Sequence, residues 1–306
     1  MQYFTYFSRF ISIIILLLTS SCNTQNKTEQ QHINERHKGN FVITADINLR
    51  YILEQLASIY HIYYPDANIS FKYTTEDDAV SNFKLKKNDI IAVEKLLSPD
   101  EIANAQFHHQ AKVLENIFAY DAIAIISNKQ NSDSIFILDK LENYLNDKSK
   151  KIVFDNKQSG IAKQLMQYSN TSAEAFKNAY AVNSVNEVLQ FIEHNNDAIG
   201  FIPYNSFSNR NEKTAQHIRT QFNILPISYH DTMYTLSQES IAAQNYPLIR
   251  PIVLYIGNCP ELVAQGFANF IFGKQISKAL LLSGLVPKNI PIREVIVTEE
   301  FHPNKK

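Results

Sequence analysis

Strand-like and helix-like patterns alternate along residues 41–297, and this alternation limits the possible fold more than any other feature of the chain. Short apolar or alternating runs predict strands at 41–44, 69–73, 89–93, 113–127, 151–154, 179–182, 198–202, 223–228, 246–256 and 292–297. Helical spacing predicts helices over 49–60, 138–145, 159–168, 185–193 and 260–282, the last broken near Gly273, and a further helix that starts after residue 98. Strands that alternate with helices are typical of an α/β fold with largely parallel sheets.

Several helix starts carry capping residues. Asn48 can cap the helix that follows the first predicted strand. Ser98 with Glu101, and Ser184 with Glu187, have the spacing of a capping box, in which side chain and backbone satisfy each other's hydrogen bonds. These signals place the helix boundaries independently of the hydrophobic pattern.

Composition excludes several classes of function. The 306 residues, 45% of them hydrophobic, are enough for one large domain or two small ones with their own cores. A formal net charge of -1 gives no basic field to hold nucleic acid. No Cys/His cluster has zinc spacing, since His108 and His109 are adjacent. We therefore predict no nucleic-acid partner, no metal and no cofactor.

The first 22 residues have the features of a secretory signal. Arg9 precedes an apolar run over residues 10–18, too short for a bilayer, which requires roughly 20 apolar residues. Small residues at 19–21 and then Cys22 follow, and this ending resembles a bacterial lipobox. The resemblance implies cleavage before Cys22 and acylation of that residue; a plain signal peptide with an incidental cysteine is the alternative. Cys259 would then be a lone thiol that serves as apolar filler.

Residues 23–40 are polar and show no hydrophobic period. Such a stretch cannot bury enough apolar area to offset its ordering entropy. We expect a flexible tether between a lipid-anchored cysteine and a domain that lies outside the cytoplasm, in the periplasm or at the cell surface.

Five segments of the chain carry a resemblance to a known family. They are DAIAIISN (121–128), KIVFDNKQSGIAKQLM (151–166), NDAIGFIPYN (196–205), YPLIRPIVLYI (246–256) and GFANFIFGKQISKALLLSGLVPKNIPIREVIV (266–297). In this order they resemble the phosphate-binding proteins of ATP-driven phosphate importers, in a divergent lipoprotein branch. The resemblance implies a type II periplasmic binding protein, with two α/β lobes joined by two crossing strands. Residues 41–126 with 246–306 would form lobe 1, and residues 127–245 would form lobe 2.

The family's anion site maps onto the chain residue by residue. Its Ser-Gly-Thr motif falls on Ser159, Gly160 and Ile161, so the threonine hydroxyl is missing. Its cleft arginine falls on Asp155, which reverses the charge, and its proton-accepting aspartate falls on Glu94. A helix start also attracts anions through its free N–H groups and its dipole; the alternative for Ser159 is a role as N-cap alone.

Three further positions are candidates for the cleft. Asp46 lies where the family has a hydroxyl-rich signature after the first strand, and Thr74 and Thr75 fall where it has a serine; a plain loop is the alternative for the threonines. If Asp46 and the two carboxylates above face one cleft, phosphate would require compensation by a lysine such as Lys95 or Lys157. A cation-bearing or neutral polar ligand suits such a cleft better.

These features predict a lipoprotein that captures a small solute between its lobes, phosphate or another small anion by family resemblance. We expect a monomer whose partner is an ABC permease or another envelope protein, and whose membrane contact is the lipid anchor. The alternative is a non-transport envelope sensor or structural protein that kept the fold. No GxSxG or HExxH motif and no nucleophile–base pair is evident, so we do not expect an enzyme.

Overall fold

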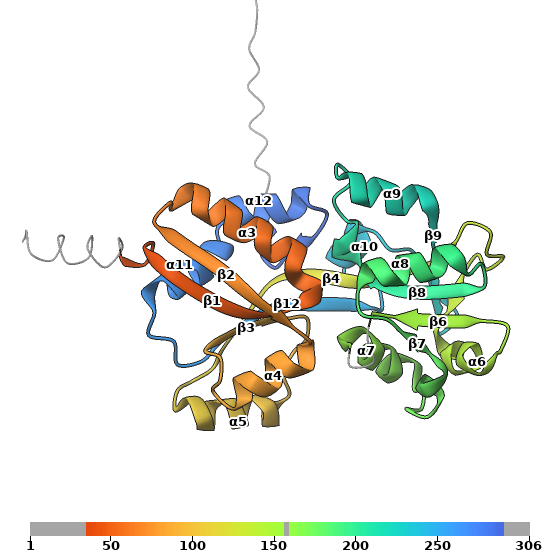
Figure 1. The fold of residues 1–306 in the computed structure, drawn as a ribbon, viewed down its shortest axis with the longest axis horizontal. Coiled ribbons are helices and arrows are strands. Elements are labelled where there is room, and N and C mark those ends of the chain that lie inside the picture. The colour runs from red at the N-terminus through yellow and green to blue at the C-terminus, as the bar shows by residue number, and fades with distance from the viewer. Residues whose placement is uncertain (1–34, 156–158, 291–306) are drawn as a thin grey trace, which may run out of the picture.

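The computed structural model describes residues 35–155 and 159–290 and has two halves side by side, each a sheet with helices on its faces (Figure 1). The strand order is β2-β1-β3-β12-β4-β8-β6-β7. The first half contains β1 (Gly39–Asp46), β2 (Ala67–Thr74), β3 (Ile90–Val93) and β12 (Ile249–Ile256). The second contains β6 (Lys151–Phe154), β7 (Tyr180–Ala181) and β8 (Ala198–Pro203). The α/β fold predicted from the alternating pattern is confirmed.

Strand β4 (Leu114–Asn128) joins the two halves because its length lets it pair with both sheets. Its first part pairs antiparallel with β12, where Asp121 lies opposite Arg250, and its last part pairs antiparallel with β8. The strands β1, β2 and β3 run parallel to one another, as do β6, β7 and β8, whereas β12 is antiparallel to β3. The apolar DAIAIIS run therefore passes through the middle of the molecule, buried on both sides.

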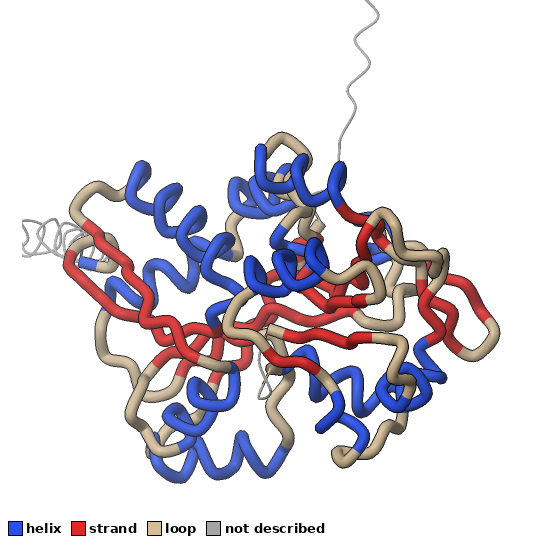
Figure 2. Tube along the Cα trace, turned by 45° about the vertical axis from the view of Figure 1, so that its right-hand side comes forward, coloured by secondary structure: helices blue, strands red, loops and turns tan. Residues whose placement is uncertain are grey.

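Helices cover both faces of the strands (Figure 2). The first half carries α3 (Arg50–Tyr63), α4 (Glu76–Lys84), α5 (Pro99–His109), α11 (Leu262–Ile271) and α12 (Lys274–Leu282). The second carries α6 (Leu141–Asn146), α7 (Gly160–Ser169), α8 (Val185–His194), α9 (Lys213–Gln221) and α10 (Gln238–Ala242). The short strands are β5 (Phe136–Ile137), β9 (Phe222–Ile224), β10 (Ile227–Tyr229), β11 (Thr232–Tyr234) and β13 (Val286–Pro287). The 3-10 turns are Ile47–Leu49, Leu138–Lys140, Ala175–Asn178 and Tyr204–Ser206.

The capping predictions are confirmed in part. Ser98 and Glu101 form a complete capping box at α5, and Ser184 accepts the N–H of Glu187 at α8. The prediction for Asn48 is wrong. Asp46 caps the 3-10 turn by accepting the Asn48 N–H, which leaves the Asn48 side chain free for another partner. The break near Gly273 is confirmed, because this glycine is the N-cap of α12.

Each half has its own hydrophobic core. One core draws on residues 122–248 together with Val286, and two adjoining cores draw on residues 43–119 and 252–285. Helix α4 is absent from the sequence prediction, and the predicted strand 223–228 is divided into β9 and β10 at Pro226. The predicted strand 292–297 lies outside the described residues. Within residues 35–155 and 159–290, no helix combines the length and apolarity required to cross a bilayer.

Candidate functional site

The carboxyl ends of the parallel strands of both halves meet at the centre of the molecule. Asp46 ends β1, Glu94 follows β3, and Asp155 follows β6. In open α/β sheets this edge is where ligands bind, because loops and helix starts replace the sheet's own hydrogen bonds there. The structure therefore brings together, at the junction of the halves, three of the residues that the sequence predicted for one cleft.

A buried arginine that the sequence analysis missed occupies the middle of this junction. Arg250, on β12, is 1% exposed. Its Nη1 lies 2.5 Å from Oε2 of Glu94, and its Nη2 lies 2.9 Å from Oε2 of Glu76. The expectation of a cleft without an arginine is thus corrected, because β12 supplies a guanidinium. The sequence signal was a charged residue inside the apolar run YPLIRPIVLYI.

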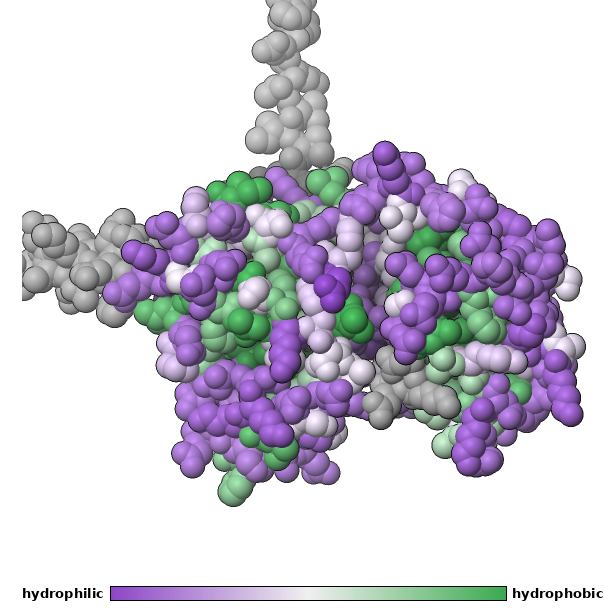
Figure 3. Space-filling model, viewed as in Figure 1, coloured by the Kyte–Doolittle hydropathy of each residue, from purple (hydrophilic) through white to green (hydrophobic). Residues whose placement is uncertain are grey.

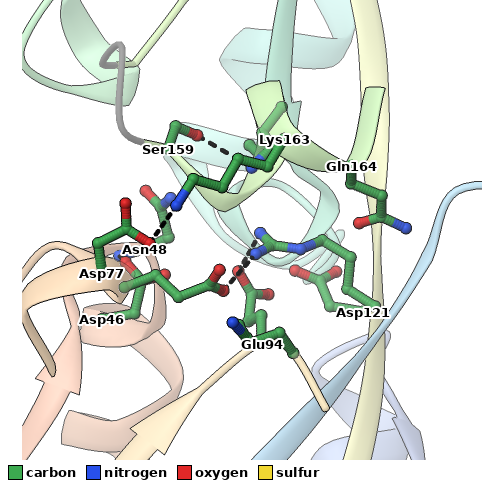
Figure 4. A network of polar contacts seen from close by, with 12 residues as sticks. Asp46, Asn48, Asp77, Glu94, Asp121, Ser159, Lys163 and Gln164 are labelled. Atoms are coloured by element: carbon green, nitrogen blue, oxygen red, sulfur yellow. Dashed lines mark hydrogen bonds and ion pairs between the residues drawn. The ribbon is translucent and has the colours of Figure 1, made fainter. Parts of the chain in front are cut away.

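Buried acidic side chains outnumber this guanidinium. The buried acidic residues of the described chain all belong to this cluster: Asp46, Glu76, Glu94, Asp121 and Asp155. Figure 4 shows Asp46, Glu94 and Asp121 turned toward a common centre. If all five were ionised, one guanidinium would face five carboxylates, which is a strongly unfavourable balance for a buried site.

Hydrogen bonds satisfy the cluster only in part. Asp121 accepts the Asn205 N–H at 3.0 Å and its side-chain amide at 2.5 Å, and Asp155 accepts the Asn48 amide at 2.8 Å. Four buried atoms of the cluster have no hydrogen-bond partner among the described residues: Asp46 Oδ2, Glu94 Oε1, Asp155 Oδ1 and Arg250 Nε. Buried polar atoms without a partner are costly, so these atoms mark places where a ligand's polar groups would be stabilising.

Burial shifts the proton equilibria of the cluster. Desolvation, reinforced by the charge of Glu76, raises the pKa of Asp46 to about 7. Desolvation also raises the pKa of Glu94 well above its usual range, and it raises the pKa of Asp121. Desolvation alone would lower the pKa of Arg250, but the charges of Glu94 and Glu76 outweigh it and raise that pKa, so the guanidinium stays charged. Protonation of some carboxyls is therefore how the cluster tolerates its excess of acids.

The start of α7 also faces this cluster. The Ser159 hydroxyl accepts a hydrogen bond from the Ile161 N–H at 3.0 Å, so Ser159 is the helix N-cap. This is the structural role that the sequence analysis gave as the alternative to ligand binding. Gly160, the first helical residue, lies so close to the ion pair that a Cβ there would be 2.4 Å from Nη2 of Arg250. Gly160 thus permits a close approach of groups that belong to the chain itself.

The two threonines lie next to cluster residues, but their hydroxyls bond to Asp78. Thr74 is opposite Asp46 in the pairing of β1 with β2, and Thr75 directly precedes Glu76. Thr75 caps α4 by accepting the Asp78 N–H, and the Thr74 hydroxyl donates to Asp78 at 3.4 Å. Lys95 is a partly exposed residue that pairs with Glu101 at 3.1 Å, and Lys157 lies outside the described residues. The hydroxyls of Thr74 and Thr75 therefore contribute to the start of α4, and a role of these threonines in ligand binding stays a prediction.

Two cavities lie against the cluster, one on each side. The first, about 540 Å³, is lined by both acidic partners of Arg250 and by Gly160, Lys163, Gln164 and Tyr168. The second, about 430 Å³, is lined by Asn48, Asp155, Asn205, Tyr51 and Glu212. Figure 3 shows the furrow between the halves, with mainly hydrophilic surface on the right and mixed surface on the left. Both volumes fall in the range that holds small polar solutes.

Several bonds join the two halves across this furrow. Lys163 of α7 pairs with Asp77 of α4, as Figure 4 shows, and Tyr51 of α3 donates to Glu212 beside α9. The Asn48–Asp155 bond lies between them. The structure therefore represents a closed arrangement, in which opening would break contacts on both sides of the cluster.

Other sites receive no support within the described ranges. Between residues 35 and 290, with 156–158 left aside, no three His, Cys, Asp or Glu side chains are placed to hold a metal ion. Cys259 is buried and free, and burial raises the pKa of its thiol to about 12, so it has little thiolate character. Cys22 lies outside the described residues.

Comparisons with known proteins agree with this architecture. The family described as the PBP superfamily domain matches residues 30–275. A structure of a putative phosphate ABC transporter substrate-binding protein from Clostridium perfringens, with bound phosphate, is 15% identical, with a TM-score of 0.67 over 82% of this chain and 100% of that one. An ABC-type phosphate transport receptor from Vibrio cholerae is 19% identical, with a TM-score of 0.60 over 80% and 99%.

The same fold also occurs outside transport proteins. The CcmR regulatory domain from Synechocystis, in complex with 2-PG, is 12% identical, with a TM-score of 0.53 over 77% of this chain and 96% of that one. At these identities the similarity establishes the type II periplasmic-binding fold and not the ligand. No curated protein matches the chain in sequence.

Proposed function

Because the chain belongs to the PBP superfamily domain family, we propose that it captures a small polar solute between its halves, and that this solute carries a positive charge. The main support for this proposal is that the buried acidic side chains of the cluster outnumber its one guanidinium, that of Arg250. An ammonium or guanidinium group on the ligand would offset the negative charge of those carboxyls that stay ionised. It would also donate to Asp46 Oδ2 and Asp155 Oδ1, which have no partner among the described residues.

The proposed cycle follows from the geometry of the halves. Opening would break the Asn48–Asp155 bond and expose the cluster to water, and closure around a ligand would restore it. We propose that residues 41–126 with 246–306 move as one lobe and residues 127–245 as the other, with β4 and the segment before β12 as the hinge. No bond is made or broken in the ligand during this cycle.

We also propose that the protein is a lipoprotein, held outside the cytoplasm by an acylated Cys22 and a tether. The tether is shorter than the predicted stretch 23–40, because His37 already stacks on Tyr64 and Gly39 begins β1. An ABC permease or another envelope protein would receive the captured solute. The support is the amino-terminal sequence and the transport proteins that share the fold.

A ligand panel tests the charge of the solute. Thermal unfolding of the purified protein is followed at pH 7 with organic ammonium and guanidinium compounds, amino acids, neutral polar solutes, phosphate and sulfate. A ligand present at 100 times its dissociation constant should raise the free energy of unfolding by about 2.7 kcal/mol. We expect such shifts from cationic compounds. Shifts from the anions alone would contradict the proposal.

Site variants then locate the ligand. Asp46→Asn and Asp155→Asn each remove one charged acceptor, so each should weaken binding of a cationic hit about 10-fold or more. Asp66→Asn, at an exposed position between α3 and β2, is the matched control and should leave the affinity unchanged. Equal affinities in all three variants would place the ligand elsewhere.

A non-transport envelope protein is the second candidate. It is favoured by the way the chain's own ion pairs fill the middle of the junction, as Arg250 does with Glu76 and Glu94. Such a protein would keep its halves closed whatever solute is present. Small-angle X-ray scattering that gives the same radius of gyration with every member of the panel, without any thermal shift, would favour this second candidate.

A further inference from the structure

The carboxylate of Glu76 is buried between Arg250 and the start of α7. Glu76 is the first residue of α4, and a residue at a helix start would usually extend into solvent. Instead it is 3% exposed and its Oε2 accepts from Nη2 of Arg250 at 2.9 Å. Asp78, two residues later and on the opposite face of the helix, is exposed.

The other side of the Glu76 carboxylate is the start of α7. A Cβ on Gly160 would lie 2.6 Å from Oε1 and 2.7 Å from Oε2 of Glu76, so the carboxylate packs directly against this glycine. The amino end of a helix carries a partial positive charge and attracts anions. Gly160 is therefore the residue whose missing side chain makes room for the carboxylate.

The guanidinium that completes this pocket has spare hydrogen-bonding capacity. Arg250 is almost fully buried, and its Nε has no partner among the described residues. A charged donor, a helix start and a glycine thus surround one carboxylate. The unpartnered Nε is an independent sign that this guanidinium can donate a further hydrogen bond to an oxygen atom.

We propose that this pocket is an anion subsite that the chain fills with its own Glu76 carboxylate, and that Glu76 determines specificity by excluding external anions. A carboxylate fixed on the same chain competes at an effective concentration of about millimolar or higher. An external anion must therefore compete with this tethered carboxylate, which weakens the anion's apparent affinity for the pocket. Because the carboxylate lies between α4 in one half and α7 in the other, it also helps to hold the halves together. This role of Glu76 does not depend on the identity of the natural ligand.

Chemical rescue distinguishes this role from that of an ordinary buried ion pair. Glu76→Ala removes the carboxylate and leaves a space of about the size of acetate. Thermal unfolding of the full chain is measured in 100 mM sodium acetate and in 100 mM sodium chloride at pH 7, since ions at such concentrations screen surface charges equally. We expect acetate to raise the melting temperature of Glu76→Ala by about 3 °C more than chloride does, in a saturable manner.

Three controls separate filling of the pocket from a general salt effect. The wild type and Glu76→Gln keep a side chain in the pocket and should show no acetate-specific rise. Asp78→Ala removes an exposed carboxylate of the same helix turn and should behave like the wild type. If Glu76→Ala does not fold in chloride, its yield on refolding is compared in the two salts instead. The inference would be overturned if acetate raised the melting temperatures of Glu76→Ala and Asp78→Ala equally. It would also be overturned if the refolding yield of Glu76→Ala were the same in both salts, or zero in both.

Discussion

Replacement of Arg250 by methionine tests whether the guanidinium holds the acidic cluster together. Methionine keeps an apolar stem of similar length but removes both charged bonds, to Glu94 at 2.5 Å and to Glu76 at 2.9 Å. Loss of one partner of a buried ion pair costs about 3–5 kcal/mol, because the remaining charge is left uncompensated. We expect a loss of that size at pH 8, where the carboxyls are most ionised.

The same replacement should cost less in acid. Burial raises the pKa of Asp46 to about 7 and that of Glu94 well above its usual range, so both carry protons at pH 5. A neutral carboxyl requires no counter-charge, and the loss at pH 5 should be smaller than at pH 8 by at least about 1 kcal/mol.

Urea unfolding followed by far-ultraviolet circular dichroism measures both losses. Arg50→Met is the control, since Arg50 is exposed and its ion pair with Glu54, at 3.6 Å, should contribute less than about 1 kcal/mol at either pH. A cost for Arg250→Met below about 1 kcal/mol at pH 8, or the same cost at both pH values, would refute the electrostatic account of the cluster.

Three further predictions concern closure, pH and location. Gly160→Ala places a Cβ 2.4 Å from Arg250 Nη2, so it should force the halves apart and raise the radius of gyration measured by small-angle scattering. The control Ser159→Ala should lose only a helix cap worth about 1 kcal/mol, and its halves should stay closed. Because the folded-state pKa of Asp46 is raised from 3.8 to about 7, the folded protein holds a proton that the unfolded chain releases. The free energy of unfolding should therefore fall as pH rises from about 4 to 7, by up to about 4 kcal/mol, and Asp46→Asn should flatten this fall in pH-dependent urea titrations. Cys22→Ser should release the protein from the membrane fraction, and unchanged attachment on fractionation would exclude the lipid anchor.

Much of the fold could be predicted from local patterns. The long strand β4 was recognisable from its apolar run, and α5 from Ser98, Pro99 and Glu101, because these signals depend on neighbours in the sequence. Helix α4 was missed although Thr75 followed by three acidic residues is a good helix start, since few residues of this helix are apolar and its hydrophobic period is therefore weak. Asn48 failed as a cap because Asp46, two residues earlier, accepts the backbone N–H at this turn.

The site was less predictable because its members are distant in the sequence. Asp46, Glu94 and Asp155 follow strands, so their convergence could be expected from the rule for parallel sheets. Arg250 and Glu76 are 174 positions apart, and nothing local indicates that they pair. The charged residue inside the strand 246–256 was a usable signal, since an arginine in a buried strand requires a buried partner.

The central claim is that the cleft's own carboxylates exclude the phosphate dianion, although the fold is that of phosphate-binding proteins. Isothermal titration of the unmodified protein with inorganic phosphate at pH 7 tests it most directly. We predict no binding, or binding weaker than about millimolar, because the surplus carboxylates repel the dianion and Glu76 already occupies the guanidinium. Asp155→Arg, which reverses one of these charges, should bind phosphate better than the wild type. Micromolar or tighter phosphate binding by the wild type would contradict the claim.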